Sequence, residues 1–299
     1  MLDEKQTSHD AEEDPRNLDT KVYVNGEIVH RDEAKVSVYD SGFMLGDGMW
    51  EGMRLYNGKW AFFEEHMDRF FGSCHAAGIL DALNRTAEAN GMTDNAHCRL
   101  MLTRGKKAKP YQHPSLSRSG PTLVIIMEHS KPSAALQTRG ITLATVPQVR
   151  GLPMSQDAKY NSHSKLNCVL ACIQAQQVGA DEGLMLDPHG FVNTTNACNF
   201  FIVRKGAVWT STGDYCMAGV TRQKVIDLCK ANDIPVYERN YSLYETYSAD
   251  EAFMTGTFGA QTPVGVIDGK KIGNGERPVM ERIQALYKDL IRADTGATL

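Results

Sequence analysis

Lys159 is the residue whose type and setting most suggest chemistry, and it stands near the start of the stretch 157–199. It follows a segment of apolar and turn residues and precedes a helix that we expect to open near His163 or Ser164. A lysine held between a strand and a helix can lose solvation, which lowers the pKa of its ammonium group. The neutral amine is then a nucleophile that forms Schiff bases. Taken alone, the stretch favours an ordinary solvated lysine.

Hydrophobic spacing predicts the elements around Lys159. The helix after it carries apolar residues on roughly one face, and Gly179 ends it before a short apolar strand. These apolar residues are Leu166, Val169, Leu170, Ile173 and Val178. Farther on, residues 217–222 open a helix that runs to about Ala231, with Thr221 as its expected N-cap. A helix start behind a glycine is a ready phosphate site, although this pattern alone is weak.

Positively charged residues elsewhere are candidates for binding an anion. Arg69 lies among the apolar residues of a helix predicted over 62–80, where its spacing alone favours a surface arginine. A basic loop, 104–121, connects strands predicted over 98–103 and 122–127. Such a loop is usually just solvated, and the alternative is that it captures a substrate carboxylate.

The composition is that of an ordinary globular protein. Hydrophobic residues make up 42% of the 299 residues, and the net charge of −4 argues against a broad nucleic-acid-binding surface. No apolar run approaches the roughly 20 residues that a membrane span requires. The acidic N-terminus lacks the basic start and apolar centre of a signal peptide. The seven cysteines show no CxxC pair, so we expect a reducing cytoplasm, no structural disulfide and no metal site.

Turn residues place further strands. Residues 22–29 predict a hairpin around Asn25-Gly26, a strand over 34–39 follows, and Asn57-Gly58 marks a second hairpin turn. A change of composition at 129–133 indicates a domain boundary. Beyond it, strands and helices alternate. The predicted strands are 141–146, 199–203, 207–210, 236–238 and 251–254, and the last helix is 278–292.

These segments together resemble one known family. The chain is similar, over about residues 22–292, to the class IV pyridoxal-phosphate aminotransferases, which include branched-chain and D-amino-acid aminotransferases. The segments that carry the resemblance are VYVNGEIV, GFMLGDGMWEGMRLYNG, EEHMDRF, TRG, GADEGLMLD, NFFIVRKGAVWTS, AGVTR and ADEAFMTGT. The resemblance implies fold type IV of the α/β class. We expect a disordered tail over 1–19, a small α+β domain over 20–130 and a larger α/β domain over 131–299.

The resemblance implies a role for each matching residue. Lys159 would hold pyridoxal 5′-phosphate as a Schiff base and later move a proton at the substrate Cα. Arg69 would bind the cofactor phosphate, because a phosphate needs a cationic fork together with convergent N–H and O–H donors. The other implied cofactor-binding residues are Thr194, Asn199, Gly219, Val220, Thr221 and Thr257.

The chain departs from the family pattern at two places. The segment between Lys159 and the helix is one or two residues longer than usual, and a competing alignment makes Lys165 the Schiff-base residue. We prefer Lys159 because Lys165 falls inside the first helical turn. In addition, Thr194 stands where the family usually has the glutamate that keeps the pyridine nitrogen protonated. A hydroxyl cannot hold that proton, so the ring would stabilise a carbanion less.

The implied function is transfer of an amino group from a branched-chain-like or D-amino acid to a 2-oxo acid such as 2-oxoglutarate or pyruvate. Substrate contacts are expected from Phe43, Arg104, Lys109 and His113. Thr194 keeps an alternative open, namely a cofactor-dependent lyase similar to aminodeoxychorismate lyase, or an amine transaminase on the same fold. The resemblance also implies a homodimer, and nothing in the composition suggests a nucleic-acid or membrane partner.

Overall fold

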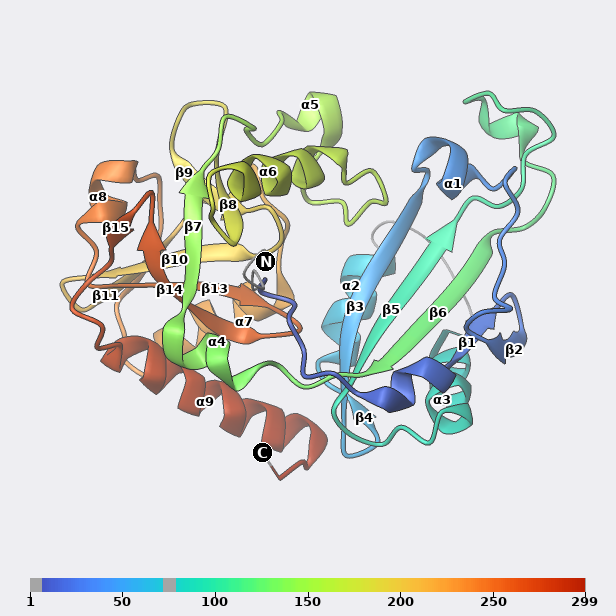
Figure 1. Ribbon diagram of the computed structural model, residues 1–299, viewed down its shortest axis with the longest axis horizontal. Helices are drawn as coiled ribbons and strands as arrows, with labels where there is room; N and C mark the ends of the chain where they lie inside the picture. The colour runs from blue at the N-terminus through green and yellow to red at the C-terminus, as the bar shows by residue number, and fades with distance from the viewer. Residues whose placement is uncertain (1–6, 72–78, 299) are drawn as a thin grey trace. The chain divides into compact units, whose positions relative to one another are not determined.

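The computed structural model describes residues 7–71 and 79–298, and these residues form two compact units (Figure 1). The small unit comprises residues 12–71, 79–131, 160–165 and 292–298. The large unit comprises residues 7–11, 132–159 and 166–291. The chain first passes from one unit to the other between residues 131 and 132, next to the expected boundary, but short segments from elsewhere complete each unit.

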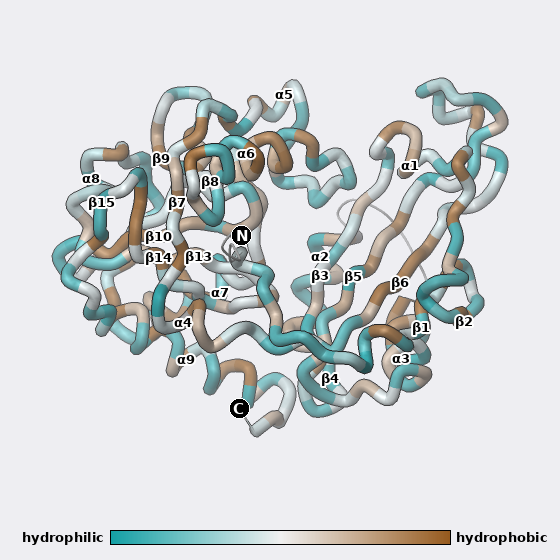
Figure 2. The backbone as a smooth tube through the Cα atoms, in the orientation of Figure 1, coloured by the Kyte–Doolittle hydropathy of each residue, from teal (hydrophilic) through white to brown (hydrophobic). Residues whose placement is uncertain are grey.

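The small unit is an antiparallel sheet with the strand order β2-β1-β6-β5-β3-β4. Its strands are β1 (Lys21–Val24), β2 (Glu27–His30), β3 (Gly48–Tyr56), β4 (Lys59–Trp60), β5 (Ala96–Thr103) and β6 (Thr122–His129). Figure 2 shows the hydrophobic stretches of β5 and β6. Alternate residues of β5 are buried, as expected for a strand with one face toward a core. The predicted hairpin over 22–29 is present, with Asn25 and Gly26 at positive φ.

Helices α2 (Phe63–Phe71) and α3 (Ile79–Ala89) supply the rest of the small unit's core. Met67 and Phe70 from α2 and Leu83 from α3 pack with Met53 and Leu100 of the sheet. A short helix, α1 (Ser41–Leu45), precedes β3, and η1 (Pro15–Asp19) and η2 (Pro114–Leu116) are single 3₁₀ turns.

The segment 160–165 adds a further extended stretch beside β3. The Trp50 N–H donates to the Asn161 carbonyl at 2.9 Å, and the His163 N–H donates to the Gly48 carbonyl at 2.8 Å. Ser162 forms a bridge with Met49 between these bonds. The residues that directly follow Lys159 are therefore fixed to the small unit's sheet by backbone hydrogen bonds.

The large unit is a mixed sheet with the order β12-β11-β10-β13-β14-β7-β8-β9 and with β15 beside β14. Its strands are β7 (Ile141–Thr145), β8 (Glu182–Leu186), β9 (Val192–Thr195), β10 (Asn199–Arg204), β11 (Ala207–Thr210), β12 (Val236–Glu238), β13 (Glu251–Gly256), β14 (Ala260–Ile267) and β15 (Lys270–Lys271). Pairs β14–β7, β7–β8 and β11–β12 are parallel. The fold is thus the expected combination of an α+β small unit and a larger α/β unit.

Both faces of the large sheet are covered. Phe200 and Ile202 of β10 lie in one hydrophobic cluster, while Phe201 and Val203 lie in another, because successive side chains of a strand point to opposite faces. Helices α7 (Val220–Ala231) and α9 (Pro278–Thr295) contribute to the second cluster. The remaining helices are α4 (Ala134–Arg139), α5 (Pro153–Gln156), α6 (Leu166–Gln177) and α8 (Leu243–Tyr247).

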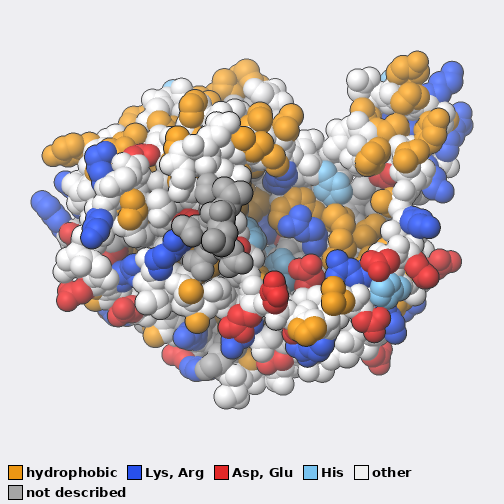
Figure 3. Space-filling model, in the orientation of Figure 1, with side chains coloured by type: hydrophobic (Ala, Val, Ile, Leu, Met, Phe, Trp, Pro, Cys, Tyr) orange, Lys and Arg blue, Asp and Glu red, His pale blue; other side chains and the backbone are white. Residues whose placement is uncertain are grey.

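Helix α6 buries the opposite face from the one that its hydrophobic spacing suggests. Ala171 and Ala175 are buried against the sheet, and a Cβ on Gly183 of β8 would lie 2.9 Å from the Ala171 carbonyl oxygen. Small residues therefore let the helix approach the strand closely. The larger apolar residues are exposed, and Figure 3 shows hydrophobic side chains gathered over α5 and α6. The exposed large apolar residues of α6 are Leu166, Val169, Leu170 and Ile173.

The structure differs from the predictions in three further segments. Residues 34–39 form no strand but a loop with exposed Val36, Val38 and Tyr39, since no neighbouring strand pairs with them within the described residues. The helix predicted over 62–80 corresponds to α2 and the start of α3, and Cys74 and Gly78 lie outside the described residues. Helix α6 begins at Leu166, so Lys165 immediately precedes it instead of lying in its first turn.

The described part of the N-terminal segment makes specific contacts. The Ser8 N–H donates to Glu182 Oε1 at 2.8 Å, and the Ser133 N–H donates to the Asp10 carbonyl. Asn17 exchanges hydrogen bonds with the backbone of His129. The described residues 7–19 thus make hydrogen bonds with β8, with Ser133 and with the end of β6.

Candidate functional site

Three polar residues lie side by side on neighbouring strands of the large unit. Asn199 at the start of β10 pairs with Thr194 of β9 on one side and with Thr255 of β13 on the other. All three residues are buried. We call Thr194, Asn199 and Thr255 the polar row. Thr257 follows directly after the end of β13 and is partly buried.

The N-terminus of α7 lies beside Asn199. Asn199 Nδ2 donates to the Met217 carbonyl at 3.1 Å, and the Gly219 N–H donates to the same carbonyl at 2.8 Å. Gly219 is the N-cap, so the prediction that Thr221 caps the helix is wrong, and Thr221 is the second helical residue. A Cβ at Gly219 would lie 2.1 Å from Asn199 Oδ1, so the close approach requires glycine.

This part of the large unit contains buried polar atoms whose hydrogen bonds are incomplete. Among the residues that the structure describes, Thr255 Oγ1 and Asn193 Oδ1 have no hydrogen-bond partner. Buried polar groups in folded proteins are nearly always paired, so these atoms require a partner from outside the chain, such as a polar ligand or an ordered water. The first N–H groups of a helix also point at anions. Together these features suit a phosphate-bearing ligand.

Thr194 uses its hydroxyl within the protein. Thr194 Oγ1 donates to the Cys198 carbonyl at 2.7 Å. Thr195 Oγ1 reaches the same carbonyl at 3.1 Å and Glu182 Oε2 at 3.2 Å. A hydrogen bond from Thr194 to a ring nitrogen would require that the bond to Cys198 be given up.

The two candidate lysines lie in different settings. Lys159 belongs to the large unit and its side chain is exposed. Its backbone N–H donates to Asp157 Oδ1 at 2.9 Å. Lys165 belongs to the small unit, is half-buried and has its ammonium 5.7 Å from the centre of the Trp50 ring. The loss of solvation that we expected for Lys159 is therefore not present in the structure. Lys159 nevertheless shares its unit with the polar row and the start of α7.

A cationic group around Trp50 in the small unit was missed by the sequence reasoning. The Arg99 guanidinium lies 4.3 Å from the Trp50 ring centre, and its burial lowers the pKa of Arg99. Burial also lowers the pKa of His163. Asn161 Oδ1 and His163 Nε2 are buried without a hydrogen-bond partner in the described part of the chain. Pairing of the segment around Asn161 with β3 brings residues more than 100 positions apart into contact. No local sequence pattern predicts this pairing.

Arg69 is held by a buried carboxylate. Arg69 Nε donates to Glu51 Oε1 at 2.8 Å, and Arg69 Nη2 donates to Glu51 Oε2 at 2.6 Å. The Arg69 side chain is 13% exposed and that of Glu51 is 1% exposed. Arg69 is thus a partly buried, oriented cation and not the surface arginine that its spacing alone favours.

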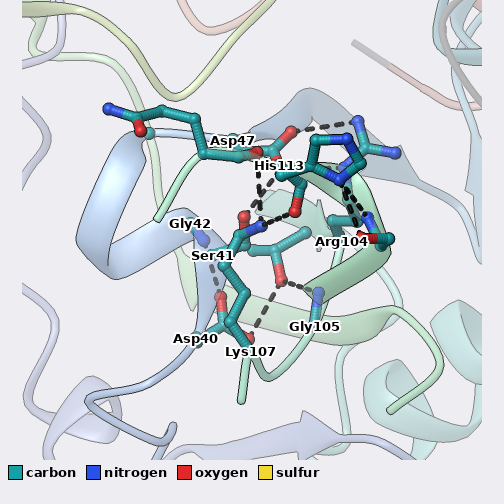
Figure 4. A network of polar contacts seen from close by, with 12 residues as sticks. Asp40, Ser41, Gly42, Asp47, Arg104, Gly105, Lys107 and His113 are labelled. Carbon is teal, nitrogen blue, oxygen red and sulfur yellow. Dashed lines mark hydrogen bonds and ion pairs between the residues drawn. The ribbon is translucent and has the colours of Figure 1, made fainter. Parts of the chain in front are cut away.

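Two of the expected substrate residues, Arg104 and His113, belong to a polar network in the small unit (Figure 4). Arg104 donates to both carboxylate oxygens of Asp47, at 2.8 and 3.2 Å, and Ser41 Oγ donates to Asp47 Oδ2 at 2.6 Å. Burial opposes the ionisation of Asp47, but these bonds outweigh it and lower the pKa of the carboxyl. Asp40 accepts bonds from the hydroxyls of Thr103 and Thr122, which ties this loop to the strands.

The expected substrate residues other than Arg104 differ in their surroundings. His113 is exposed and its Nδ1 lies 2.7 Å from Ser115 Oγ, while Lys109 is exposed. Lys107 is the buried lysine of this loop, and its ammonium donates to the His113 carbonyl at 3.2 Å. Phe43 on α1 is 74% exposed, so it lines no apolar pocket within the small unit.

Comparison with known proteins places the chain in a family. Residues 48–267 match the family model described as amino-transferase class IV. The chain is 42% identical to branched-chain-amino-acid aminotransferase-like protein 2 of Arabidopsis thaliana, over 92% of this chain, and spans about half of that relative, 51%. It is 36% identical to the putative branched-chain-amino-acid aminotransferase of Methanocaldococcus jannaschii, covering 90% of this chain and 96% of the relative.

A solved structure shows the same architecture. The branched-chain amino acid aminotransferase of Escherichia coli matches with a TM-score of 0.80 and 26% identity, covering 94% of this chain and 96% of that one. Fold, site and comparisons agree, and the chain belongs to the class IV aminotransferases. Within the described residues, no helix is long and apolar enough to cross a membrane, and no cluster of potential metal ligands occurs.

Proposed function

We propose that this chain is a pyridoxal 5′-phosphate-dependent aminotransferase that moves an amino group from an amino acid to a 2-oxo acid. The observation that carries the proposal is the polar row beside the N-terminus of α7. Thr255 Oγ1 has no partner among the described residues, Gly219 permits the close approach of Asn199, and helix N–H groups lie next to them. This donor set fits a phosphate.

The residues that the family resemblance implies would divide the cofactor between them. The N–H groups of Val220 and Thr221 and the hydroxyls of Thr221 and Thr257 would hold the phosphate, and Arg69 would add its charge. When bound, the cofactor supplies the carbonyl that accepts the amino group and a ring that withdraws electrons. Lys159 would bind the cofactor covalently and carry the proton to and from the substrate Cα.

The substrate carboxylates require cations, and the structure offers two sources. Arg104 is paired with Asp47, so a carboxylate must compete with that ion pair. Arg99 stands over Trp50 with Lys165 on the same ring, which supports the proposal that this group binds the acidic end of an acceptor such as 2-oxoglutarate. The donor would be a branched-chain-like or D-amino acid. The comparisons do not favour the lyase alternative, since the relatives named above are described as aminotransferase-like and as a putative aminotransferase.

We further propose a homodimer located in the cytoplasm. The exposed apolar face of α6 and exposed Phe43 are surfaces that a second copy of the chain would cover. The six cysteines within the described residues are free thiols, which fits a reducing compartment. Sedimentation of the purified protein tests the dimer, and a protein that remains monomeric at micromolar concentration would contradict it.

The proposed reaction is tested by measuring its first half-reaction, with an amino donor and no acceptor. The purified protein, loaded with pyridoxal 5′-phosphate, is mixed with L-amino acids, D-amino acids or simple amines in the absence of an acceptor. We expect conversion of the bound cofactor to pyridoxamine 5′-phosphate with at least one amino acid, followed by return to the aldehyde form on addition of 2-oxoglutarate or pyruvate. Release of pyruvate without formation of pyridoxamine 5′-phosphate would instead indicate a lyase.

Thr194→Glu is expected to raise the rate of the donor half-reaction by about tenfold, which corresponds to about 1.4 kcal/mol of barrier. A carboxylate at this buried position restores a group that keeps the ring nitrogen protonated and strengthens electron withdrawal. Stopped-flow absorbance measures the rate and the cofactor spectrum. Thr194→Gln is the control, because it adds similar volume without charge. Equal rates and spectra for wild type and Thr194→Glu would show that the side chain of residue 194 does not contact the ring nitrogen.

A further inference from the structure

Glu51 and His66 form a buried charged cluster with Arg69 in the small unit. Glu51 lies on β3, and His66 and Arg69 lie one helical turn apart on α2. His66 Nδ1 is 2.8 Å from Glu51 Oε2, the same oxygen that accepts from Arg69 Nη2 at 2.6 Å. The side chains of Glu51 and His66 are almost completely buried. None of the roles assigned so far uses these two residues.

The cluster keeps Glu51 ionised in an apolar core. Burial alone would raise the pKa of Glu51, but the hydrogen bonds from His66 and Arg69 outweigh it and lower the pKa. An ionised carboxylate accepts both bonds from the Nε–Nη2 edge of a guanidinium, which fixes the plane of the group and the direction of its outer edge. His66 contacts Oε2 of the same carboxylate and so restricts its rotation.

We propose that Glu51 is a positioning residue that orients Arg69 for the phosphate of the cofactor, with His66 fixing Glu51 in turn. This inference rests on the proposed role of Arg69. It also predicts the direction in which phosphate affinity changes when Glu51 is removed. Glu51 carries a negative charge close to the cation that would bind the phosphate dianion. As a charge alone, Glu51 weakens phosphate binding, and its removal would tighten it. As an orienting group, Glu51 strengthens binding, and its removal weakens it.

The test compares two ligands that differ by the phosphate group. Dissociation constants of pyridoxal 5′-phosphate and of pyridoxal are measured by equilibrium dialysis for wild type and Glu51→Gln. Glutamine keeps the size of the side chain but loses one acceptor for the guanidinium. We expect the dissociation constant of pyridoxal 5′-phosphate to rise about tenfold, as for loss of one charge-assisted hydrogen bond, and that of pyridoxal to stay unchanged.

A double-mutant cycle separates orientation from general damage. In an Arg69→Ala background, Glu51→Gln should cause no further loss of pyridoxal 5′-phosphate affinity, because the group to be oriented is gone. Asp181→Asn is the matched control. Asp181 is a buried carboxylate paired with Arg139 in the large unit, at 2.9 Å, and its loss should leave the ratio of the two dissociation constants unchanged. If Glu51→Gln does not fold, Glu51→Asp carries the test, since it moves the oxygens while keeping the charge.

Several outcomes would overturn the inference. Tighter binding of pyridoxal 5′-phosphate by Glu51→Gln would show that Glu51 acts as an opposing charge. An equal loss for both ligands, or no change, would show a structural role. If wild type binds pyridoxal 5′-phosphate no better than pyridoxal, a phosphate site is absent, and the inference falls together with the proposed function. If wild type binds pyridoxal 5′-phosphate tightly and Glu51→Gln has the same dissociation constant, the inference about Glu51 is wrong but the proposed function stands.

Discussion

Lys159→Ala is expected to abolish amino transfer and the covalent attachment of pyridoxal 5′-phosphate. Without the amine, neither the covalent bond to the cofactor nor the proton movement at the substrate Cα is possible at this residue. Acid–base catalysis by a positioned side chain alone contributes about 10²–10⁴-fold, so residual turnover should be below one per cent. Borohydride reduction, protease digestion and mass spectrometry identify the modified lysine in the unaltered protein.

Lys165→Ala is the matched control for this prediction. It removes an ammonium from the side of Trp50 but should leave the cofactor covalently bound. The surroundings of the two lysines favour the opposite assignment. Lys165 is half-buried near other cations, a setting in which lysines become nucleophilic, whereas Lys159 is exposed. Cofactor recovered on a peptide that contains Lys165 would refute the assignment of Lys159.

Arg69→Ala is expected to weaken binding of pyridoxal 5′-phosphate by about 2–5 kcal/mol, the range for truncating one partner of a buried charge pair. The same change should lower the free energy of unfolding, because buried Glu51 loses the partner that donates two of its hydrogen bonds. The Glu51–Arg69 pair changes the expected effect on stability, since the family resemblance of the segment around Arg69 suggests a loss of cofactor retention with little loss of stability.

A double variant separates the two losses. Arg69→Ala combined with Glu51→Gln removes the uncompensated charge, so it should recover most of the stability but none of the cofactor affinity. Urea unfolding without cofactor measures stability, and equilibrium dialysis measures affinity. Arg85→Ala serves as the control, because Arg85 is an exposed arginine of α3 in the same unit. Unchanged cofactor affinity in Arg69→Ala would exclude Arg69 from the phosphate site.

Features set by nearby residues could be predicted. The hairpin over 22–29 forms because Asn25-Gly26 tolerates positive φ between two β-prone runs. Strands β5, β6, β10 and β11 and helix α7 likewise lie close to their predicted bounds. The strand predicted over 34–39 fails, because apolar residues at alternate positions form a strand only where a neighbour pairs with them.

The sequence by itself determined the family, the two-part α/β organisation and the set of residues to consider, since these depend on local periodicity and on short motifs. Only the tertiary structure decided which of those residues meet. Asn199 pairs with both Thr194 and Thr255 through strand register. Arg69 donates hydrogen bonds to Glu51, which lies 18 positions earlier, and Arg104 forms an ion pair with Asp47. Pairing partners depend on register and on which face of an element is buried, and in α6 the close approach to β8 favoured the small alanines over the larger apolar face.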